Sequence, residues 1–268
     1  MEHKIKKVSL IMTTYNCHDQ FLISIESALD QDYPDIELVI VDGGSTDGTA
    51  DLIREYADKI SKDREKYGNF TCKWISEPDK GIYDGMNKGI GMSSGDIIAV
   101  FNDEFTCRDA VSNYVHILED GNYDAVHSDL VYADGDVWKR YWHMPNGNLH
   151  LGWMPAHPTL YIRREVYDRY GLYKTEYRSS SDYEFMIRIL ADGRLKLGYI
   201  PKVLIKMFYG GTSSAGLKGY ARNTREAYLS LVNNKVAFPV TIIVLRIIRT
   251  LHQYRVADKM QKELEHYN

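Results

Sequence analysis

Short apolar runs alternate with helical periodicity along the first hundred residues of the chain. Phe21, Leu22, Ile25, Ala28 and Leu29 recur at the spacing of one helix face, between two β-branched-rich runs. The same alternation continues through a glycine-rich turn at 43–48 to two further apolar runs. It predicts strands at residues 8–13, 36–41, 72–76 and 96–101, with helices between them that include residues 82–90. This order is typical of an α/β protein with a mostly parallel sheet.

The pattern is looser after residue 104. It predicts a helix at 108–118, strands at 125–132 and 158–163, and a helix at 181–191. From about residue 217 the chain is expected to be helical, with Pro239 breaking the pattern before the apolar stretch 240–251. That stretch is shorter than the roughly 20 apolar residues that cross a bilayer.

Composition narrows the class of protein. The 268 residues, 44% hydrophobic and 26% charged, indicate a globular protein with one large domain or one domain plus an appendage. A net charge of -4 makes nucleic acid an unlikely partner, since phosphate-backbone binders carry a basic excess. Cys17, Cys72 and Cys107 are too widely spaced to suggest a disulfide framework or a zinc site. These features favour a cytoplasmic protein.

Each predicted strand ends in polar residues, where open α/β sheets bind their ligands. The first strand ends without the Gly-x-Gly-x-x-Gly turn of dinucleotide-binding proteins, so a nicotinamide cofactor is not expected. Thr13 and Tyr15 could instead hydrogen-bond and stack on a nucleobase. An ordinary strand-to-helix turn, with Asn16 near the helix cap, is the alternative.

Two other strand ends carry carboxylates. Asp42 precedes two glycines and could accept hydrogen bonds from a base or ribose, unless it serves only the turn. Asp103 and Glu104 follow the fourth strand, where carboxylates can hold a divalent cation that bridges a diphosphate. A solvated turn is the competing interpretation.

The segment 77–89 is densely polar around a short helix. Asp84 and Asn87 are three residues apart and therefore share a face. An exposed ion pair between Asp84 and Lys88 is the plainer explanation, but it leaves the Asp79-Lys80-Gly81 loop unexplained. Further on, Ser181 and Glu184 have the spacing of a capping box, and Asp182 between them could merely complement the helix dipole.

Taken together, three segments resemble the family 2 glycosyltransferases, bacterial enzymes with the GT-A fold that build surface polysaccharides and lipopolysaccharide. The likeness covers residues 5–215, and the segments keep the order and spacing of the family. They are Thr13-Thr14-Tyr15-Asn16, Val41-Asp42-Gly43-Gly44-Ser45-Thr46-Asp47-Gly48-Thr49, and Glu77-Pro78-Asp79-Lys80-Gly81-Ile82-Tyr83-Asp84-Gly85-Met86-Asn87-Lys88-Gly89.

The resemblance implies an α/β architecture of the GT-A type, in which a Rossmann-like nucleotide-binding half merges with an acceptor half. These would be residues 1–104 and 105–215 of a domain spanning 1–215, followed by a C-terminal helical tail at 216–268.

The resemblance also implies roles for particular residues. Thr13, Tyr15 and Asp42 would hold a uridine-like base, and Asp182 would be the catalytic base. The donor ribose, diphosphate and sugar would be lined by Asp79, Lys80, Asp84 and Asn87. His157 stands where the family often carries a histidine near the acceptor pocket, with packing inside the protein as the alternative.

One departure concerns the metal. The family usually ends the fourth strand with acidic residues around an Asp-x-Asp pattern, whereas this chain has Asn102-Asp103-Glu104-Phe105. Asp103 and Glu104 nevertheless remain the candidate ligands of Mn²⁺ or Mg²⁺.

We therefore expect an inverting glycosyltransferase, of the hexosyl or N-acetylhexosaminyl class, acting in cell-surface glycan synthesis. It would move a sugar from a nucleotide-diphosphate sugar, with UDP favoured because the family uses it most, to a saccharide or lipid-linked acceptor. Asp182 would accept the hydroxyl proton while Lys80 and the cation stabilise the departing diphosphate. A non-catalytic sugar-nucleotide-binding subunit is the alternative. A nucleotidyltransferase would need a Gly-rich, arginine-containing loop where residues 13–16 stand.

The tail adds a prediction about location. On a helical wheel one side gathers Ile243, Val244, Ile247, Ile248, Leu251 and Tyr254, and the other side gathers Arg246, Arg249, Thr250 and Gln253. This pattern predicts peripheral membrane contact through 240–256, on the inner face of the cell membrane, or else packing on a protein surface.

Overall fold

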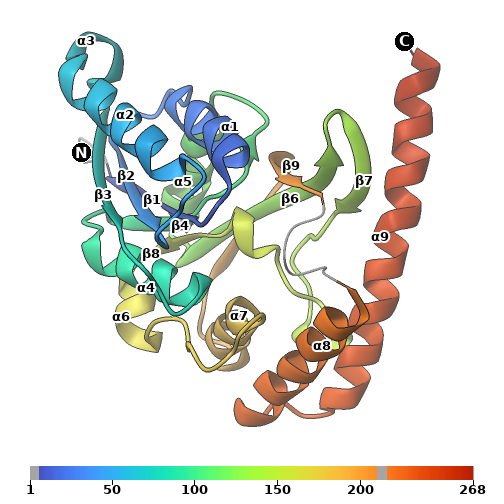
Figure 1. Ribbon diagram of the computed structural model, residues 1–268. Coiled ribbons are helices and arrows are strands. Elements are labelled where there is room, and N and C mark those ends of the chain that lie inside the picture. Colours follow the sequence, from blue (N-terminus) through green and yellow to red (C-terminus); the bar gives the residue numbers. More distant parts are fainter. Residues whose placement is uncertain (1–5, 210–215, 268) are drawn as a thin grey trace.

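A computed structural model describes residues 6–209 and 216–267 of the chain. A nine-stranded mixed sheet runs through the molecule, with helices against both of its faces (Figure 1). The strands are β1 (Val8–Thr14), β2 (Ile36–Asp42), β3 (Phe70–Ser76), β4 (Ile97–Val100), β5 (Glu104–Phe105), β6 (Ala125–Asp134), β7 (Val137–Trp142), β8 (Tyr161–Arg163) and β9 (Leu197–Phe208).

The helices separate the strands in chain order. They are α1 (His18–Leu29), α2 (Thr49–Lys62), α3 (Arg64–Tyr67), α4 (Ile82–Met92), α5 (Ala110–Asp120), α6 (Arg164–Tyr170), α7 (Ser181–Ala191), α8 (Gly216–Asn233) and α9 (Pro239–Tyr267), with 3₁₀ turns η1 (Leu149–Leu151) and η2 (His157–Thr159).

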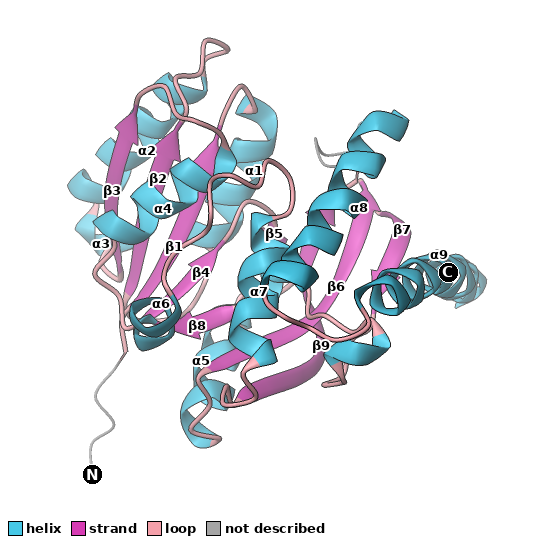
Figure 2. Cartoon of the chain, turned by 90° about the horizontal axis from the view of Figure 1, so that it is seen from below, coloured by secondary structure: helices cyan, strands magenta, loops and turns pink. Residues whose placement is uncertain are grey.

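The strand order is β3-β2-β1-β4-β8-β6-β9-β5, with β7 paired to β6. Figure 2 shows the first four of these strands side by side. β3, β2, β1 and β4 are parallel, and β8 is antiparallel to both β4 and β6. Because β6 therefore runs in the direction of β4, the carboxyl ends of β1, β2, β4, β6 and β9 meet at one edge of the sheet.

Two hydrophobic clusters cover the two faces of the sheet. Alternate residues of β1 divide between them: Leu10 and Met12 pack with α1, α2 and α5, whereas Ile11 packs with α4, α6 and α7. Buried side chains of α8 and α9, among them Leu231 and Ile242, complete the second cluster. The predicted α/β fold is confirmed, and the helical tail forms part of the core.

The sequence pattern located the strands of the first half within a few residues. In the second half it placed a strand at 158–163, but Pro158 lies in η2 and only Tyr161–Arg163 is extended. It did not predict β5, β7 or β9. Strand β9 contains Pro201 at an interruption of its pairing with β6, and a proline inside an apolar run argues against a strand.

Helix α9 lies along the hairpin β6–β7 and passes over the turn η1 (Figure 1). Gly152 follows this turn with φ +69°, and a Cβ there would lie 2.6 Å from the backbone nitrogen of Arg246. Only glycine permits this close approach. In the described part of the chain, no helix is both long and apolar enough to cross a membrane.

The three cysteines are free and partly buried. Burial raises the pKa of the Cys72 thiol to about 12, and it also raises the pKa of Cys17 and of Cys107.

Candidate functional site

The ends of β1 and β4 are joined by a pair of hydrogen bonds. Asn102 accepts from the backbone N–H of Thr13 at 2.8 Å, and its amide nitrogen donates to the Thr13 hydroxyl at 3.0 Å. Asn102 is the position at which the chain departs from an acidic pattern. An aspartate could not donate the second bond, so here the side chain acts as a connector between strands.

Asp42, at the end of β2, is fully buried. Its carboxylate accepts hydrogen bonds from the hydroxyls of Thr14, Ser45 and Ser76 and from the backbone N–H groups of Gly44 and Ser45. Burial would raise the pKa of Asp42, but these donors outweigh it and hold the pKa below its ordinary value. The visible role of Asp42 is to hold the Gly43-Gly44 turn, and contact with a base stays a prediction.

Three segments meet around the Gly43 backbone. A Cβ at Gly43 would lie 2.9 Å from Asp79 Oδ2 and 3.3 Å from the ring of Tyr15. A Cβ at Gly85 would lie 3.3 Å from Thr13 and 3.4 Å from the same Asp79 oxygen. The structure thus gathers Thr13, Tyr15 and Asp79 at the predicted sheet edge. The Tyr15 side chain is 65% exposed, so its ring is open to a stacking partner.

The loop before α4 is held by its own carboxylates. Asp79 accepts from the backbone of Gly81 at 2.8 Å, and Asp84 accepts from the backbone of Lys80 at 3.1 Å. The Lys80 side chain is exposed. The ion pair of Asp84 with Lys88 also exists, at 3.7 Å, while Lys88 lies closer to Glu77, at 2.8 Å. Lys80 is therefore the cation that remains directed to solvent in this loop.

Asn87 connects α4 to the loop between α6 and α7. Its amide nitrogen donates to the carbonyl of Tyr173 at 2.8 Å, and its amide oxygen accepts from the Tyr173 N–H at 3.0 Å. Both polar atoms of the side chain are thus bound to the loop before α7. Its predicted contact with the donor remains untested.

The predicted metal ligands do not converge. Glu104 forms an ion pair with Lys206 of β9 at 2.7 Å. Asp103 is 6% exposed, and burial raises its pKa to about 7 despite a hydrogen bond from the Phe208 backbone. The described residues contain no group of three or more His, Cys, Asp or Glu side chains that could hold a metal ion. This donor set does not fit a bound cation as it is arranged here.

Asp182 lies in the first turn of α7, in the predicted acceptor half, and its side chain faces α4 of the predicted donor half. Its Oδ1 accepts a hydrogen bond from the hydroxyl of Tyr83, in α4, at 2.9 Å. Burial, followed by the charge of Asp182, raises the pKa of Tyr83, which keeps the phenol protonated as a donor. Sequence reasoning missed Tyr83. The only available signal was its position beside Asp84, in a helix whose neighbouring apolar residues face the core.

His157 lies in η2 and is buried, with Nε2 2.7 Å from the hydroxyl of Tyr173. Burial lowers its pKa, so the imidazole is neutral near pH 7. Tyr173 packs in turn against the ring of Tyr83, with centroids 6.1 Å apart. His157 therefore supports the wall behind Asp182, and direct contact with an acceptor stays a prediction.

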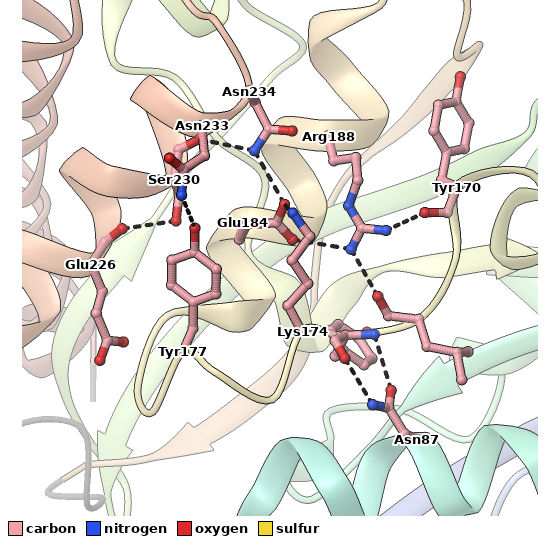
Figure 3. A network of polar contacts seen from close by, with 12 residues as sticks. Asn87, Tyr170, Lys174, Tyr177, Glu184, Arg188, Glu226, Ser230, Asn233 and Asn234 are labelled. Atoms are coloured by element: carbon pink, nitrogen blue, oxygen red, sulfur yellow. Dashed lines mark hydrogen bonds and ion pairs between the residues drawn. The ribbon is translucent and has the colours of Figure 1, made fainter.

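A buried polar network fixes the loop that leads to Asp182 (Figure 3). Glu184 is fully buried and pairs with Lys174 at 2.7 Å and Arg188 at 3.0 Å. Asn234 donates to it at 3.1 Å, from the end of α8. The capping-box interpretation is therefore wrong: the helix begins after Ser180, and the Glu184 carboxylate faces these partners.

A second glutamate holds the same loop from α8. Glu226 accepts hydrogen bonds from the backbone of Arg178 and Ser179 and from the Ser179 hydroxyl. Since the loop ends at Ser180, these bonds fix the point at which α7 begins and therefore the position of Asp182. A glutamate so far along the chain gave no sequence signal for this role.

Comparison with solved structures assigns this arrangement to the GT-A fold. A mannosyltransferase of Pyrobaculum calidifontis, solved in complex with GDP-Man and Mn²⁺, matches with a TM-score of 0.66 at 19% identity, over 94% of this chain and 74% of the other. TarS 1–349 of S. aureus, in complex with UDP-GlcNAc, matches with a TM-score of 0.67 at 18% identity, over 93% and 74%.

The chain belongs to the family described as Glycosyl transferase family 2, whose profile matches residues 9–187. A PGL/p-HBAD biosynthesis glycosyltransferase of Mycobacterium bovis is 26% identical over 92% of this chain and 96% of its own length. A UDP-Glc:alpha-D-GlcNAc-diphosphoundecaprenol beta-1,3-glucosyltransferase of Escherichia coli is 27% identical over 69% and 71%. The predicted family is confirmed, and the protein is a nucleotide-sugar glycosyltransferase.

Proposed function

We propose that the protein transfers a sugar from a nucleotide-diphosphate sugar to a hydroxyl group by a single displacement with inversion. One observation carries the proposal: the Asp182 carboxylate is partly exposed and is held at 2.9 Å by Tyr83, which adjoins the donor loop. A base fixed against the donor half is what a one-step transfer needs.

The proton and electron pairs balance in this step. The acceptor oxygen forms a bond to the anomeric carbon, its proton passes to Asp182, and the bond to the diphosphate oxygen breaks with its electron pair. Tyr15 and Thr13 would hold the base, and Asp79 and Asp84 would shape the sugar side of the pocket. Lys80, whose ammonium group is exposed, would stabilise the leaving diphosphate.

Names of relatives support the choice of donor and acceptor. The Escherichia coli relative is named for UDP-Glc and a diphosphoundecaprenol-linked acceptor, and the TarS structure contains UDP-GlcNAc. We therefore favour a UDP-sugar, with either a hexosyl or an N-acetylhexosaminyl group. The acceptor would be a saccharide or lipid-linked glycan in cell-surface synthesis, met at the cytoplasmic face of the membrane, with His157 supporting its pocket.

Whether the reaction requires Mn²⁺ or Mg²⁺ is to be measured, and the proposed mechanism does not include a metal ion. A structural relative was solved with Mn²⁺. Here Asp103 is buried and Glu104 is paired with Lys206, so no step above depends on a cation.

A panel of UDP-, GDP- and dTDP-sugars, each with and without Mn²⁺, tests the activity through release of the nucleoside diphosphate. We expect turnover with at least one UDP-sugar, and loss of most turnover in Asp182→Asn with donor binding retained. Binding of a donor without turnover by any of the panel, in the presence of lipid-linked and free saccharide acceptors, would instead favour a non-catalytic sugar-nucleotide-binding subunit.

A further inference from the structure

Helix α9 has a buried side and an exposed side. Ile242 and Ala257 are fully buried, and Ile243 and Gln253 are nearly so. The opposite side carries large aliphatic residues at spacings of four, four and three, which we call the outer stripe. Its members and their exposed fractions are Val240 (62%), Val244 (49%), Ile248 (55%) and Leu251 (60%).

This division differs from the helical wheel drawn from the sequence. The wheel placed Arg246 and Gln253 on the polar side, opposite the apolar residues, but both face the protein. Arg246 lies 4.4 Å above the ring of Tyr183, and Gln253 accepts a hydrogen bond from Arg140 at 2.6 Å. Packing on the catalytic domain therefore uses Arg246 and Gln253 together with the buried Ile242 and Ile243. The outer stripe is left without a partner among the described residues.

Exposed apolar side chains are concentrated in this part of the molecule. Of the 16 large hydrophobic residues exposed in the described chain, nine fall between Tyr220 and Tyr254, and Phe238 at the start of α9 is the most exposed, at 76%. Large apolar residues exposed together on one side of a helix, as in the outer stripe, mark a contact site more often than a solvated surface.

The same segment is strongly basic. Residues 216–260 contain eight Lys and Arg against two Asp and Glu, a net charge of +6 in a chain whose total is -4. One of the two acids, Glu226, is buried in the α7 loop contacts, and Arg255 and Lys259 extend the exposed side beyond Leu251. Positive charge is thus concentrated in the segment that contains α8 and α9, while the rest of the chain carries -10, and Arg249, Arg255 and Lys259 are exposed on α9 itself.

We propose that the outer stripe and its basic surroundings bind an anionic lipid surface, with α9 lying in the membrane interface. Aliphatic side chains would enter the headgroup boundary and the arginines and lysines would neutralise acidic headgroups. A second copy of the chain is the less suitable occupant, because two faces of the same positive charge repel each other.

The placement has a consequence for the reaction site. Arg246 of α9 covers Tyr183, and Tyr183 directly follows Asp182 in α7. A lipid surface against the outer stripe therefore lies across α9 from Tyr183, the neighbour of Asp182 in α7. That geometry suits an acceptor anchored in the same surface, although binding to lipid does not depend on the proposed reaction.

Sedimentation of the full chain with vesicles tests the proposal. We expect binding to phosphatidylglycerol-containing vesicles at low salt, much weaker binding to phosphatidylcholine vesicles, and release as salt is raised. The double variant Ile248→Glu/Leu251→Glu should reduce the bound fraction at least about tenfold, since it places charges where apolar contact is needed. The matched control Ile23→Glu changes an exposed isoleucine on α1, which is 41% exposed, and should bind as the wild type does.

Three results would overturn the proposal: no sedimentation of the wild type at low salt, equal binding to both kinds of vesicle, or a control as defective as the double variant. A concentration-dependent dimer that Ile248→Glu/Leu251→Glu abolishes, without vesicle binding, would assign the stripe to a second copy. A melting temperature of the double variant close to that of the wild type shows that it is folded, and this control does not depend on the proposed function.

Discussion

At the scale of single residues, the contact between Tyr83 and Asp182 joins a phenol of α4 to a carboxylate of α7. If Asp182 is the general base, Asp182→Asn should lower kcat by about 10²- to 10⁴-fold while donor affinity is kept. Steady-state kinetics and donor titration measure the two effects separately. Near-normal turnover would remove Asp182 from the reaction.

Tyr83→Phe removes only the hydrogen bond that positions this carboxylate. We expect a fall in kcat of about tenfold with little change in KM for the donor, since one charge-assisted hydrogen bond is lost. A kcat close to the wild-type value together with a lowered melting temperature would assign Tyr83 a packing role alone.

Asp103 allows a prediction about pH and stability. Burial raises its pKa to about 7 in the folded chain, so the folded state favours the protonated form. Its contribution to stability is complete below pH ~4 and is lost as pH rises through about 7, a change on the order of 4 kcal/mol. Asp103→Asn cannot ionise, and it should melt above the wild type at pH 8 by a margin that shrinks at pH 5.

Asp136→Asn provides the control for this comparison, because the Asp136 side chain is exposed in the turn after β6. The difference in melting temperature between Asp136→Asn and the wild type should be about the same at pH 5 and at pH 8. If Asp103→Asn melts above the wild type by the same amount at both pH values, Asp103 is not held in a buried, protonated state.

Much of the donor site could be predicted at this scale, and the connecting residues could not. Thr13, Tyr15 and Asp79 follow from the rule that parallel strands bring their polar ends together. The bond between Asn87 and Tyr173 joins residues 86 positions apart, and no local pattern reveals such a pair. Glu184 shows the opposite case, in which a local capping pattern was present and tertiary ion pairs took its place.

At the scale of elements, α4 is pressed against β1 through a glycine. A Cβ at Gly89 would clash with Cγ2 of Ile11, whereas a Cβ at Gly91, in the same helix, would meet nothing within 4 Å. Gly89→Ala should therefore destabilise the protein by about 1–3 kcal/mol through overpacking. Gly91→Ala should be neutral or stabilise by up to about 1 kcal/mol, because alanine favours the helix.

Chemical denaturation of the two variants measures this difference directly. The pair is matched, since each adds one methyl group to α4. If both variants lose stability to the same extent, intrinsic helix properties rather than contact with Ile11 account for the effect.

Elements of the first half were predictable because each strand is one uninterrupted apolar run between helical repeats. In the second half the signals are mixed. The two-residue β5 is too short to have a pattern, and β7 is an edge strand of the sheet whose residues are half-exposed or exposed. Its assignment to the sheet depends on pairing with β6, which a linear pattern does not contain.

At the scale of the whole molecule, α8 and α9 complete the second hydrophobic cluster. Ala227, Leu231 and Ile242 are fully buried in this cluster, where α8 contacts both α7 and α9. A chain ending at residue 215 would expose this surface, and each of the larger side chains is worth about 1.5–3 kcal/mol. We expect that truncation to lower the melting temperature sharply or to give aggregated protein. A truncated chain that melts with the full one would support treating residues 216–268 as a separate tail.

The overall architecture was predictable from the family resemblance, and the role of the tail was not. A helical wheel shows that a helix has an apolar and a polar side, but it does not show which residues face the protein. Here Arg246 stacks on Tyr183 and the nearby Gly152 permits close approach, so Arg246 packs inward with Ile242, and the outer stripe stays outside.

The buried thiols give the chain a practical property. A cysteine reacts with alkylating reagents through its thiolate, and with a pKa of about 12 only a fraction on the order of 10⁻⁴ or less of Cys72 is ionised near neutral pH. Cys17 and Cys107 are also shifted against ionisation. A cysteine introduced by His252→Cys, at an exposed position of α9, would therefore take up a maleimide fluorophore ahead of the native thiols. The emission of that fluorophore would report the polarity around α9 without any prior removal of the native cysteines.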